Sequence, residues 1–249
     1  MSEIMPPGFY NMDCMKAMKQ FPDKFFDLAI VDPPYGDANG GNFWNRFGNK
    51  DSRFERYKRQ NLDGEKQKGE IHHPECARTG GTWAEKYGKK IIAWDEAPSE
   101  EYFEELFRVS KNQIIWGGNY FPLPPTRCFL IWRKLTISEN FSMAMAEYAW
   151  TSFNGNAKVF EAAPQGNKND KRFHPTQKPI SLYSWILNRW AKQGDKILDT
   201  HVGSASSLIA CHRAGMEYWG FEIDPVYYST AKERLDLEKA QATIFDLGE

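Results

Sequence analysis

The sequence predicts an α/β fold in which a mostly parallel sheet carries helices on both faces. Three observations lead to this fold class. A compact apolar run over Phe25–Val31 has the character of a buried strand. From Ile91 onward, strand-like and helix-like segments alternate, which is typical of a parallel sheet covered by helices. The chain has 249 residues, 41% of them hydrophobic, which is enough for a single domain over residues 1–249.

The first elements can be justified in chain order. The Phe25–Val31 strand must end abruptly because two prolines follow it closely. A helix is expected to begin after Ser99, with two glutamates in its first turn, and to end near Val109. Residues that favour strands recur in three further segments, which are Gln113–Trp116, Cys128–Trp132 and Glu147–Phe153.

The C-terminal third predicts strands that alternate with helices. Pro179–Lys192 should be a helix, with its proline in the first turn. A strand, a helix, a strand and a helix are then expected in that order over Lys196–Asp199, Ser204–Ala214, Tyr218–Ile223 and Pro225–Leu235.

Two polar segments interrupt this pattern. Residues 37–90 hold 12 basic and 8 acidic residues and little apolar periodicity, so we interpret them as an inserted basic and aromatic loop region. Arginines and lysines alternate there with aromatic residues, which suits phosphate contact and base stacking, although a solvated surface loop has the same composition. A second, shorter loop is expected over residues 154–173.

Composition and charge exclude several classes of protein. The net charge of −1 excludes a uniformly basic coat but leaves room for a local basic patch. The 4 cysteines form no C-x-x-C pair, which favours a reducing, cytoplasmic location. We expect no signal peptide, because Met1–Gln20 has no apolar h-region. We also expect no membrane contact, because no stretch approaches the roughly 18 apolar residues that span a bilayer.

The stretch Gly194–Tyr228 predicts a ligand site. A strand that ends at Asp199 passes through a tight turn at Gly203 into a helix near Ser204. Such a turn lets a ligand approach the backbone and the helix N-terminus. Glu222 ends the next strand and could hold ribose hydroxyls, which points to a nucleoside-containing cofactor. A plain strand–helix–strand packing unit is the alternative.

The tetrapeptide Asp32-Pro33-Pro34-Tyr35 predicts a second site at the end of a strand. The prolines lack N–H donors, so the Asp32 carboxylate and the Pro33 carbonyl make this backbone rich in acceptors. Tyr35 adds a ring on which a planar group can stack. An exocyclic amino group on a purine or pyrimidine fits both features, whereas a rigid turn after the strand is the alternative.

Together these motifs resemble the DNA amino-methyltransferases of the permuted beta class, which modify adenine N6 or cytosine N4. The resemblance covers residues 10–35 and 91–235, and the catalytic motif precedes the cofactor loop as it does in that class. Five segments carry it, namely Asn11–Met15, Asp32–Tyr35, His174–Pro179, Asp199–Ser207 and Gly220–Tyr228.

The cofactor loop departs from the family's D-P-F-x-G-S-G-T-T pattern at three positions. Thr200 replaces the proline, His201 replaces the phenylalanine and Ala205 replaces the second glycine. His201 is still planar and could pack on the cofactor as the phenylalanine does. Nearer the N-terminus, Asn11 replaces the glycine of the family's G-D-C segment.

The resemblance implies a Rossmann-like, circularly permuted methyltransferase fold that uses S-adenosylmethionine. It implies site-specific methylation of adenine N6 in double-stranded DNA, with the base flipped out and with residues 154–173 at the place of the target-recognition region. A homodimer and a restriction endonuclease counterpart would accompany that activity. The implied catalytic residues are Asp32, Pro33, Pro34 and Tyr35. The implied cofactor-binding residues are Asp13, Cys14, Asp32, Thr176, Lys178, Asp199, His201, Gly203, Ser204, Ala205, Glu222 and Ile223.

Several alternatives stay open. An aspartate at position 32 favours adenine, because cytosine enzymes of the family more often have serine there. Relatives that methylate RNA bases or protein glutamine usually carry N-P-P-Y after the cofactor loop, unlike this chain. The altered loop suggests a catalytically silent DNA-binding relative, although Asp32, Tyr35, Asp199 and Glu222 are retained. The segment His72–Cys76 lacks the paired spacing of a zinc site, so no metal is expected.

Overall fold

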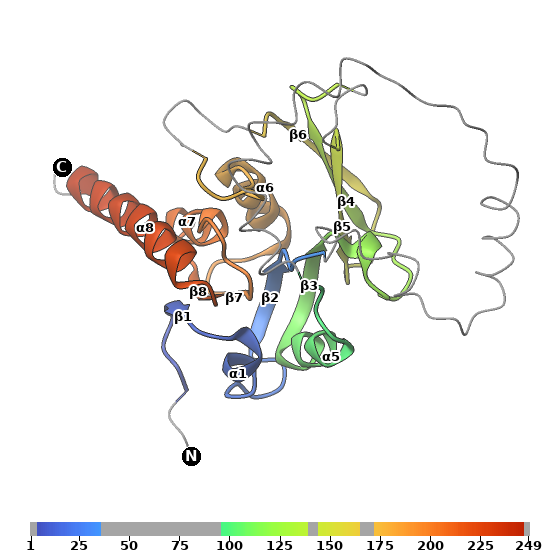
Figure 1. Cartoon of the computed structure of the whole chain (residues 1–249), viewed down its shortest axis with the longest axis horizontal. Coiled ribbons are helices and arrows are strands. Elements are labelled where there is room, and N and C mark those ends of the chain that lie inside the picture. The colour runs from blue at the N-terminus through green and yellow to red at the C-terminus, as the bar shows by residue number, and fades with distance from the viewer. Residues whose placement is uncertain (1–3, 36–95, 139–143, 165–171, 247–249) are drawn as a thin grey trace, which may run out of the picture.

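The computed structural model describes residues 4–35, 96–138, 144–164 and 172–246, which form an eight-stranded sheet with helices packed against it (Figure 1). The sheet order is β1-β8-β7-β2-β3-β5-β4-β6. In chain order the strands are β1 (Gly8–Asn11), β2 (Phe26–Val31), β3 (Ser110–Trp116), β4 (Phe129–Lys134), β5 (Ala146–Thr151), β6 (Lys158–Ala162), β7 (Lys196–Asp199) and β8 (Glu217–Glu222).

The sheet is mostly parallel, as predicted. Five consecutive strands of the sheet run parallel to one another, namely β1, β8, β7, β2 and β3. β5 is the exception, because it pairs antiparallel with both β3 and β4. At the far edge, β6 again runs parallel to β4. The parallel half therefore brings the carboxyl ends of β2, β7 and β8 to one edge of the sheet.

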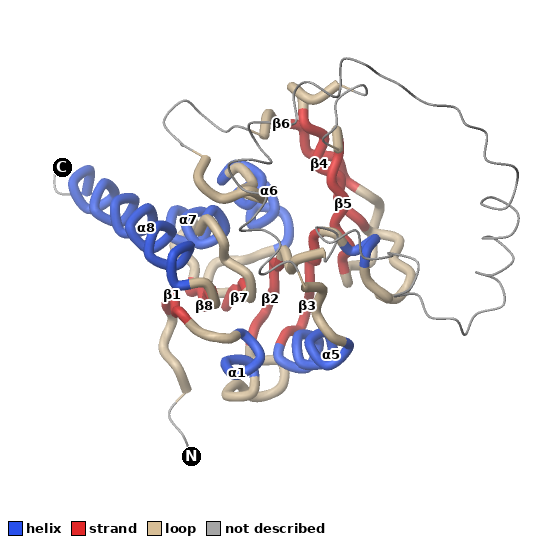
Figure 2. The backbone as a smooth tube through the Cα atoms, in the orientation of Figure 1, coloured by secondary structure: helices blue, strands red, loops and turns tan. Residues whose placement is uncertain are grey.

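Helices cover both faces of this sheet, which confirms the predicted layers (Figure 2). One face carries α6 (Ile180–Trp190), α7 (Ser206–Arg213) and α8 (Pro225–Asp246), and the other carries α1 (Cys14–Met18) and α5 (Glu100–Val109). Alternate residues of a strand point to opposite faces. In β2, Leu28 and Ile30 accordingly join the core under α6 and α7, whereas Ala29 and Val31 join the core under α1 and α5.

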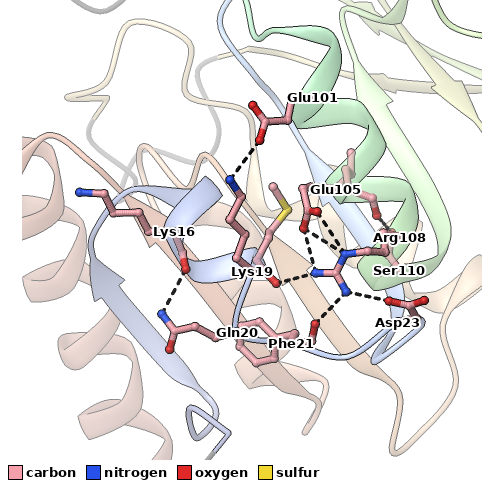
Figure 3. A network of polar contacts seen from close by, with 11 residues as sticks. Lys16, Lys19, Gln20, Phe21, Asp23, Glu101, Glu105, Arg108 and Ser110 are labelled. Carbon is pink, nitrogen blue, oxygen red and sulfur yellow. Dashed lines mark hydrogen bonds and ion pairs between the residues drawn. The ribbon is translucent and has the colours of Figure 1, made fainter. Parts of the chain in front are cut away.

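The short helix α1 is fastened at both ends. Asp13 caps its N-terminus, since its Oδ1 accepts hydrogen bonds from the backbone N–H groups of Met15 at 2.7 Å and Lys16 at 3.1 Å. Arg108 of α5 donates to the carbonyls of Met18 at 3.1 Å and Phe21 at 2.9 Å, at the C-terminal end (Figure 3). A helix of five residues is marginal alone, so these contacts fix it beside the sheet.

Most predicted elements exist, and their bounds differ by a few residues. The expected strand Gln113–Trp116 begins earlier, at Ser110, and the expected helix Pro225–Leu235 continues to Asp246. Three elements lack a predicted counterpart: β1, α1 and β6. β6 lies inside residues 154–173, which were expected to form a loop, so that segment contributes the edge strand of the sheet. The predicted basic region over residues 37–90 lies outside the described residues.

Candidate active site

A cavity of about 410 Å³ opens at the carboxyl ends of β2, β7 and β8. That volume falls within the roughly 300–1,000 Å³ of typical small-molecule sites, and this edge is where α/β sheets bind ligands. Most of the predicted site residues line it, namely Asp13, Cys14, Asp32, Pro33, Pro34, Tyr35, Thr176, Lys178, His201, Gly203, Ser204, Glu222 and Ile223. Asp199 and Ala205 do not line the cavity but lie in the turn beside it.

The carboxylate of Asp32 is held by two side chains. Its Oδ1 accepts a hydrogen bond from the Tyr35 hydroxyl at 2.8 Å, and its Oδ2 is paired with the ammonium of Lys178. Burial raises the pKa of Asp32, and the charge of Lys178 opposes that rise. The lysine therefore favours the ionised form of a carboxylate that burial alone would tend to protonate.

Lys178 belongs to a longer chain of alternating charges. Its Nζ also lies 3.1 Å from Glu147 Oε2, and Glu147 Oε1 lies 2.6 Å from Lys134 Nζ. Each lysine sits near a tryptophan ring, with Lys178 5.3 Å from the ring centre of Trp116 and Lys134 5.2 Å from that of Trp132. These four charges sum to zero, which makes their burial tolerable.

The pKa shifts of the two middle members of this chain, Lys178 and Glu147, favour their charged forms. Burial lowers the pKa of Lys178, but the negative charges of Asp32 and Glu147 together raise it by more, so the net shift is upward. Burial raises the pKa of Glu147, but the two lysines outweigh it, so the net shift is downward. Sequence reasoning missed Glu147, because a glutamate within a predicted strand has no motif around it.

Tyr35 lies in a tight aromatic setting. Its ring stacks on that of Tyr120 with centroids 4.7 Å apart and planes 14° apart. Gly117 makes this possible, since a Cβ there would lie 2.1 Å from Cε1 of Tyr35, and the φ of +66° also favours glycine. The turn Trp116–Phe121 thus contacts the tetrapeptide directly.

The side chain of Asp199 holds the turn that follows β7. Its carboxylate accepts hydrogen bonds from the Ser207 hydroxyl and from the His201 backbone N–H, the latter at 3.0 Å. Burial raises its pKa to about 7, and these two hydrogen bonds oppose the rise. Ala205 follows in the left-handed region at φ +61°, the conformation that a glycine adopts without strain. The replacement of the family's second glycine therefore leaves the backbone in a glycine-like conformation.

Two further carboxylates that line the cavity bind nearby backbone N–H groups, namely Glu222 and, at the start of α1, Asp13. The two carboxylate oxygens of Glu222 accept the backbone N–H groups of Gly203 and Asp224, each at 2.9 Å. Burial raises the pKa of Glu222, and these hydrogen bonds oppose it. Asn11 donates to the Glu222 carbonyl at 2.7 Å, which fixes the end of β8 against β1. Each carboxylate oxygen of Glu222 keeps a second lone pair that can accept a hydrogen bond from a ligand.

Three other lining residues have distinct roles. Thr176 Oγ1 lies 3.2 Å from Nδ1 of His174, whose pKa burial and Lys178 lower to about 3. Cys14 is largely buried, and burial raises the pKa of its thiol to about 12, so it lines the wall as a neutral thiol. Tyr102 was not predicted from the sequence, yet its hydroxyl lies 2.6 Å from Thr200 Oγ1 beside the turn.

This donor and acceptor set fits an adenosyl cofactor. Asp13, Glu222 and His201 face the same cavity as the Asp32 tetrapeptide, which places ribose- and base-binding chemistry next to an acceptor-rich loop. Within the described residues, no group of three or more metal-ligating side chains is close enough to hold a metal ion. In the same part of the chain, no helix has the length and apolarity required to span a membrane.

Comparison with known proteins gives several matches. The model of the family described as DNA methylase (N6_N4_Mtase) matches residues 55–233, including much of the segment 37–90 for which the motifs offered no counterpart. Type II methyltransferase M.HpaI of Haemophilus parainfluenzae is 28% identical, covering 91% of this chain and 73% of its own. Type II methyltransferase M2.DpnII of Streptococcus pneumoniae is 26% identical and covers 94% of each chain.

Two solved structures share the fold. The M1.HpyAVI–SAM complex superposes with a TM-score of 0.51 at 16% identity, covering 91% of this chain and 98% of that one. The cytosine-N4-specific PvuII DNA methyltransferase superposes with a TM-score of 0.51 at 11% identity, covering 92% and 86%. These confirm the Rossmann-like methyltransferase fold, in which β2, the strand before the Asp32 tetrapeptide, precedes β7, the strand before the Gly203 turn, in the chain. By the family match over residues 55–233, the chain belongs to the N6/N4 DNA methylases.

Proposed function

We propose that this protein transfers a methyl group from S-adenosylmethionine to the exocyclic N6 of an adenine flipped out of double-stranded DNA. The family uses S-adenosylmethionine and acts on DNA. The observation that carries the proposal is the Asp32 carboxylate, which is paired with Lys178 and lies with Pro33 and Tyr35 on the wall of one cavity with the turn after β7.

The chemistry that the bound cofactor supplies is an electrophilic methyl group. The amine is a poor nucleophile because its lone pair is delocalised into the base ring. Asp32 and the Pro33 carbonyl accept its two hydrogens, which favours a more tetrahedral nitrogen whose lone pair faces the methyl group. As the nitrogen gains positive charge, the Asp32 carboxylate stabilises it and takes the proton. Positioning and electrostatics thus provide most of the rate.

Tyr35 supports the base in this mechanism. Its hydroxyl donates to Asp32 Oδ1, and the second lone pair of that oxygen can accept a hydrogen from the amino group of the base. Its ring is already braced on one side by Tyr120. Stacking of the base on the other side offsets part of the few kcal/mol that unstacking from the duplex costs.

The remaining site residues divide among the parts of the cofactor. Glu222 suits the ribose hydroxyls and Asp13 the adenine, while Cys14, Ser204 and Ile223 add to the cavity wall. Lys178 uses two of its three N–H donors on Asp32 and Glu147. Its third N–H can meet the methionine carboxylate beside Thr176. Asp199 and Ala205 shape the turn and need not contact the cofactor.

Two experiments test the function. The protein is incubated with labelled S-adenosylmethionine and unmethylated duplex DNA, which is then digested to nucleosides. N6-methyladenine supports the proposal, N4-methylcytosine selects the cytosine alternative, and absence of label from nucleic acid contradicts both. The Asp32→Ala variant should abolish transfer and leave cofactor binding by calorimetry largely intact, because its carboxylate serves the amino group. Loss of binding instead would contradict that assignment.

The finer partners of the reaction belong to the same proposal. We infer that residues 37–90 contact DNA and that residues 154–173 take part in target recognition. The Type II relatives support a restriction endonuclease counterpart. A homodimer and a cytoplasmic location also remain predictions, which sedimentation of the purified protein and cell fractionation would check.

A further inference from the structure

Three polar side chains form a hydrogen-bonded row beside the cavity. The Tyr102 hydroxyl on α5 lies 2.6 Å from Thr200 Oγ1, and that same oxygen lies 2.9 Å from Nδ1 of His201. All three residues line the cavity. Thr200 and His201 stand where the family pattern has proline and phenylalanine, neither of which can form this row. The row is therefore a property of this chain's own sequence.

The direction of each hydrogen bond follows from burial. Tyr102 and Thr200 are each only 3% exposed, so both hydroxyl hydrogens need an acceptor. Among the described residues, Thr200 is the one hydrogen-bond partner of the Tyr102 hydroxyl. If Tyr102 donates to Thr200 and Thr200 donates to Nδ1, both hydrogens are satisfied. The reverse order would leave the Tyr102 hydrogen without an acceptor.

The protonation states of Tyr102 and His201, at the two ends of the row, agree with hydrogen bonds that run from Tyr102 towards His201. Burial raises the pKa of the Tyr102 phenol well above its usual value, so the phenol keeps its proton as a donor. Burial lowers the pKa of His201 to about 4, so the imidazole is neutral at pH 7. A neutral imidazole carries one proton, and because Nδ1 accepts from Thr200, that proton resides on Nε2. Nε2 has no hydrogen-bond partner within the described residues.

We infer that the Nε2–H of His201 donates a hydrogen bond to a ring nitrogen of the cofactor's adenine, and that Tyr102 and Thr200 are positioning residues that hold the required tautomer. The adenine ring presents only acceptors at N1, N3 and N7. The inference rests on the proposed cofactor, and it gives His201 a polar contact that the phenylalanine of the family pattern lacks.

The tautomer is tested on the full-length protein without cofactor. Histidine ring nitrogens are labelled with ¹⁵N, and the His201 signals are assigned by their loss in His201→Phe. We expect a protonated Nε2 and an unprotonated Nδ1 at pH 7. Thr200→Val should give a mixture of tautomers, whereas Thr230→Val, the same change on the surface of α8, should leave His201 unaltered. A protonated Nδ1 in the wild type, or an unaltered tautomer in Thr200→Val, would overturn the inference.

The contact itself is tested by calorimetry with S-adenosylhomocysteine and its 1-deaza, 3-deaza and 7-deaza analogues. One analogue should bind the wild type about 3- to 10-fold more weakly than the parent, as expected for one lost hydrogen bond, and the same analogue should show no such penalty with His201→Phe. Binding without a His201-dependent penalty overturns this inference alone. If the wild type does not bind S-adenosylhomocysteine, the proposed function fails as well.

Discussion

At the scale of single residues, the ionisation of Asp32 depends on one buried lysine. The carboxylate must be ionised to accept the amino hydrogens, yet burial raises its pKa and the charge of Lys178 opposes that rise. Loss of the lysine would leave only the Tyr35 hydrogen bond to oppose burial and the charge of Glu147, so the pKa of Asp32 would rise further. More of the Asp32 side chain would then be protonated, and a protonated acid cannot take the proton that the methylated nitrogen releases.

We therefore predict that Lys178→Met moves the acidic limb of the kcat–pH profile to higher pH and lowers activity at pH 7. Activity should recover as the pH rises through the new Asp32 pKa. Lys134→Met is the matched control, because Lys134 also lies near a tryptophan and pairs with Glu147 but does not touch Asp32. An acidic limb that stays in place in Lys178→Met would contradict the role of the lysine.

The sequence could predict only part of this residue-scale picture. The tetrapeptide and most of the cofactor residues were identified by motif, and the structure brings them to one cavity. Glu147 and Tyr102 were not, because their roles arise from contacts between segments far apart in the chain. Burial and charge pairing carry no local signal, so a glutamate in a strand or a tyrosine in a helix could not be singled out beforehand.

At the scale of elements, the turn after β3 determines where Tyr35 lies. Gly117→Ala should displace Tyr35, because its new Cβ would fall 2.1 Å from that ring, and transfer activity should drop. Gly194→Ala is the matched control, since Gly194 also has a positive φ, +88°, but nothing within 4 Å of a Cβ. Thermal unfolding should show about 1–2 kcal/mol of backbone strain in both variants. Equal activities would contradict the steric argument.

The packing of α1 against α5 makes a second prediction at this scale. Arg108→Met removes donors to two backbone carbonyls and to Asp23 and Glu105, and should destabilise the protein by about 2 kcal/mol. Arg213→Met is the control, because the Arg213–Glu238 pair is more exposed and should cost less than about 1 kcal/mol. Urea denaturation measures both, and equal midpoints would contradict the capping role.

Prediction of the elements succeeded where the local sequence carries a clear signal, such as a compact apolar run or the residues that start a helix. The buried strands β2 and β7 and the helix α5 have the expected character and bounds. β1 and α1 are short segments without such a signal, and β6 has no buried residue because it lies at the edge of the sheet. These three elements are specified by the strands and helices beside them, which is why their local sequence did not predict them.

At the scale of the whole molecule, charge is distributed unevenly along the chain. Residues 37–90 carry an excess of basic residues in a chain whose net charge is −1, so the rest of the chain is acidic in balance. A near-neutral total is therefore compatible with a basic arm on an acidic catalytic domain. The positions of these basic residues lie outside the described residues, and their role remains a prediction.

Replacement of Arg53, Arg56 and Arg59 by alanine should weaken DNA binding and flatten its salt dependence, because fewer counterions are released. The control removes three lysines, Lys111, Lys192 and Lys196, from the amino ends of β3 and β7, at the edge of the sheet opposite the cavity. Fluorescence anisotropy with duplex DNA over a range of salt concentrations measures both slopes. An unchanged slope in the arginine variant would exclude this segment from the interface.

The chain of charges that ends at Asp32 also constrains the order in which the protein can fold. Asp32 and Lys178 are 146 residues apart, and Glu147 comes from a third segment. Contacts of such long sequence separation form slowly, because large loops must close first. Until β5 and the segment before α6 have docked, Asp32 has no cation beside it and burial is unfavourable. The charge pairing of Asp32 is thus completed late, when these distant segments have assembled on the sheet.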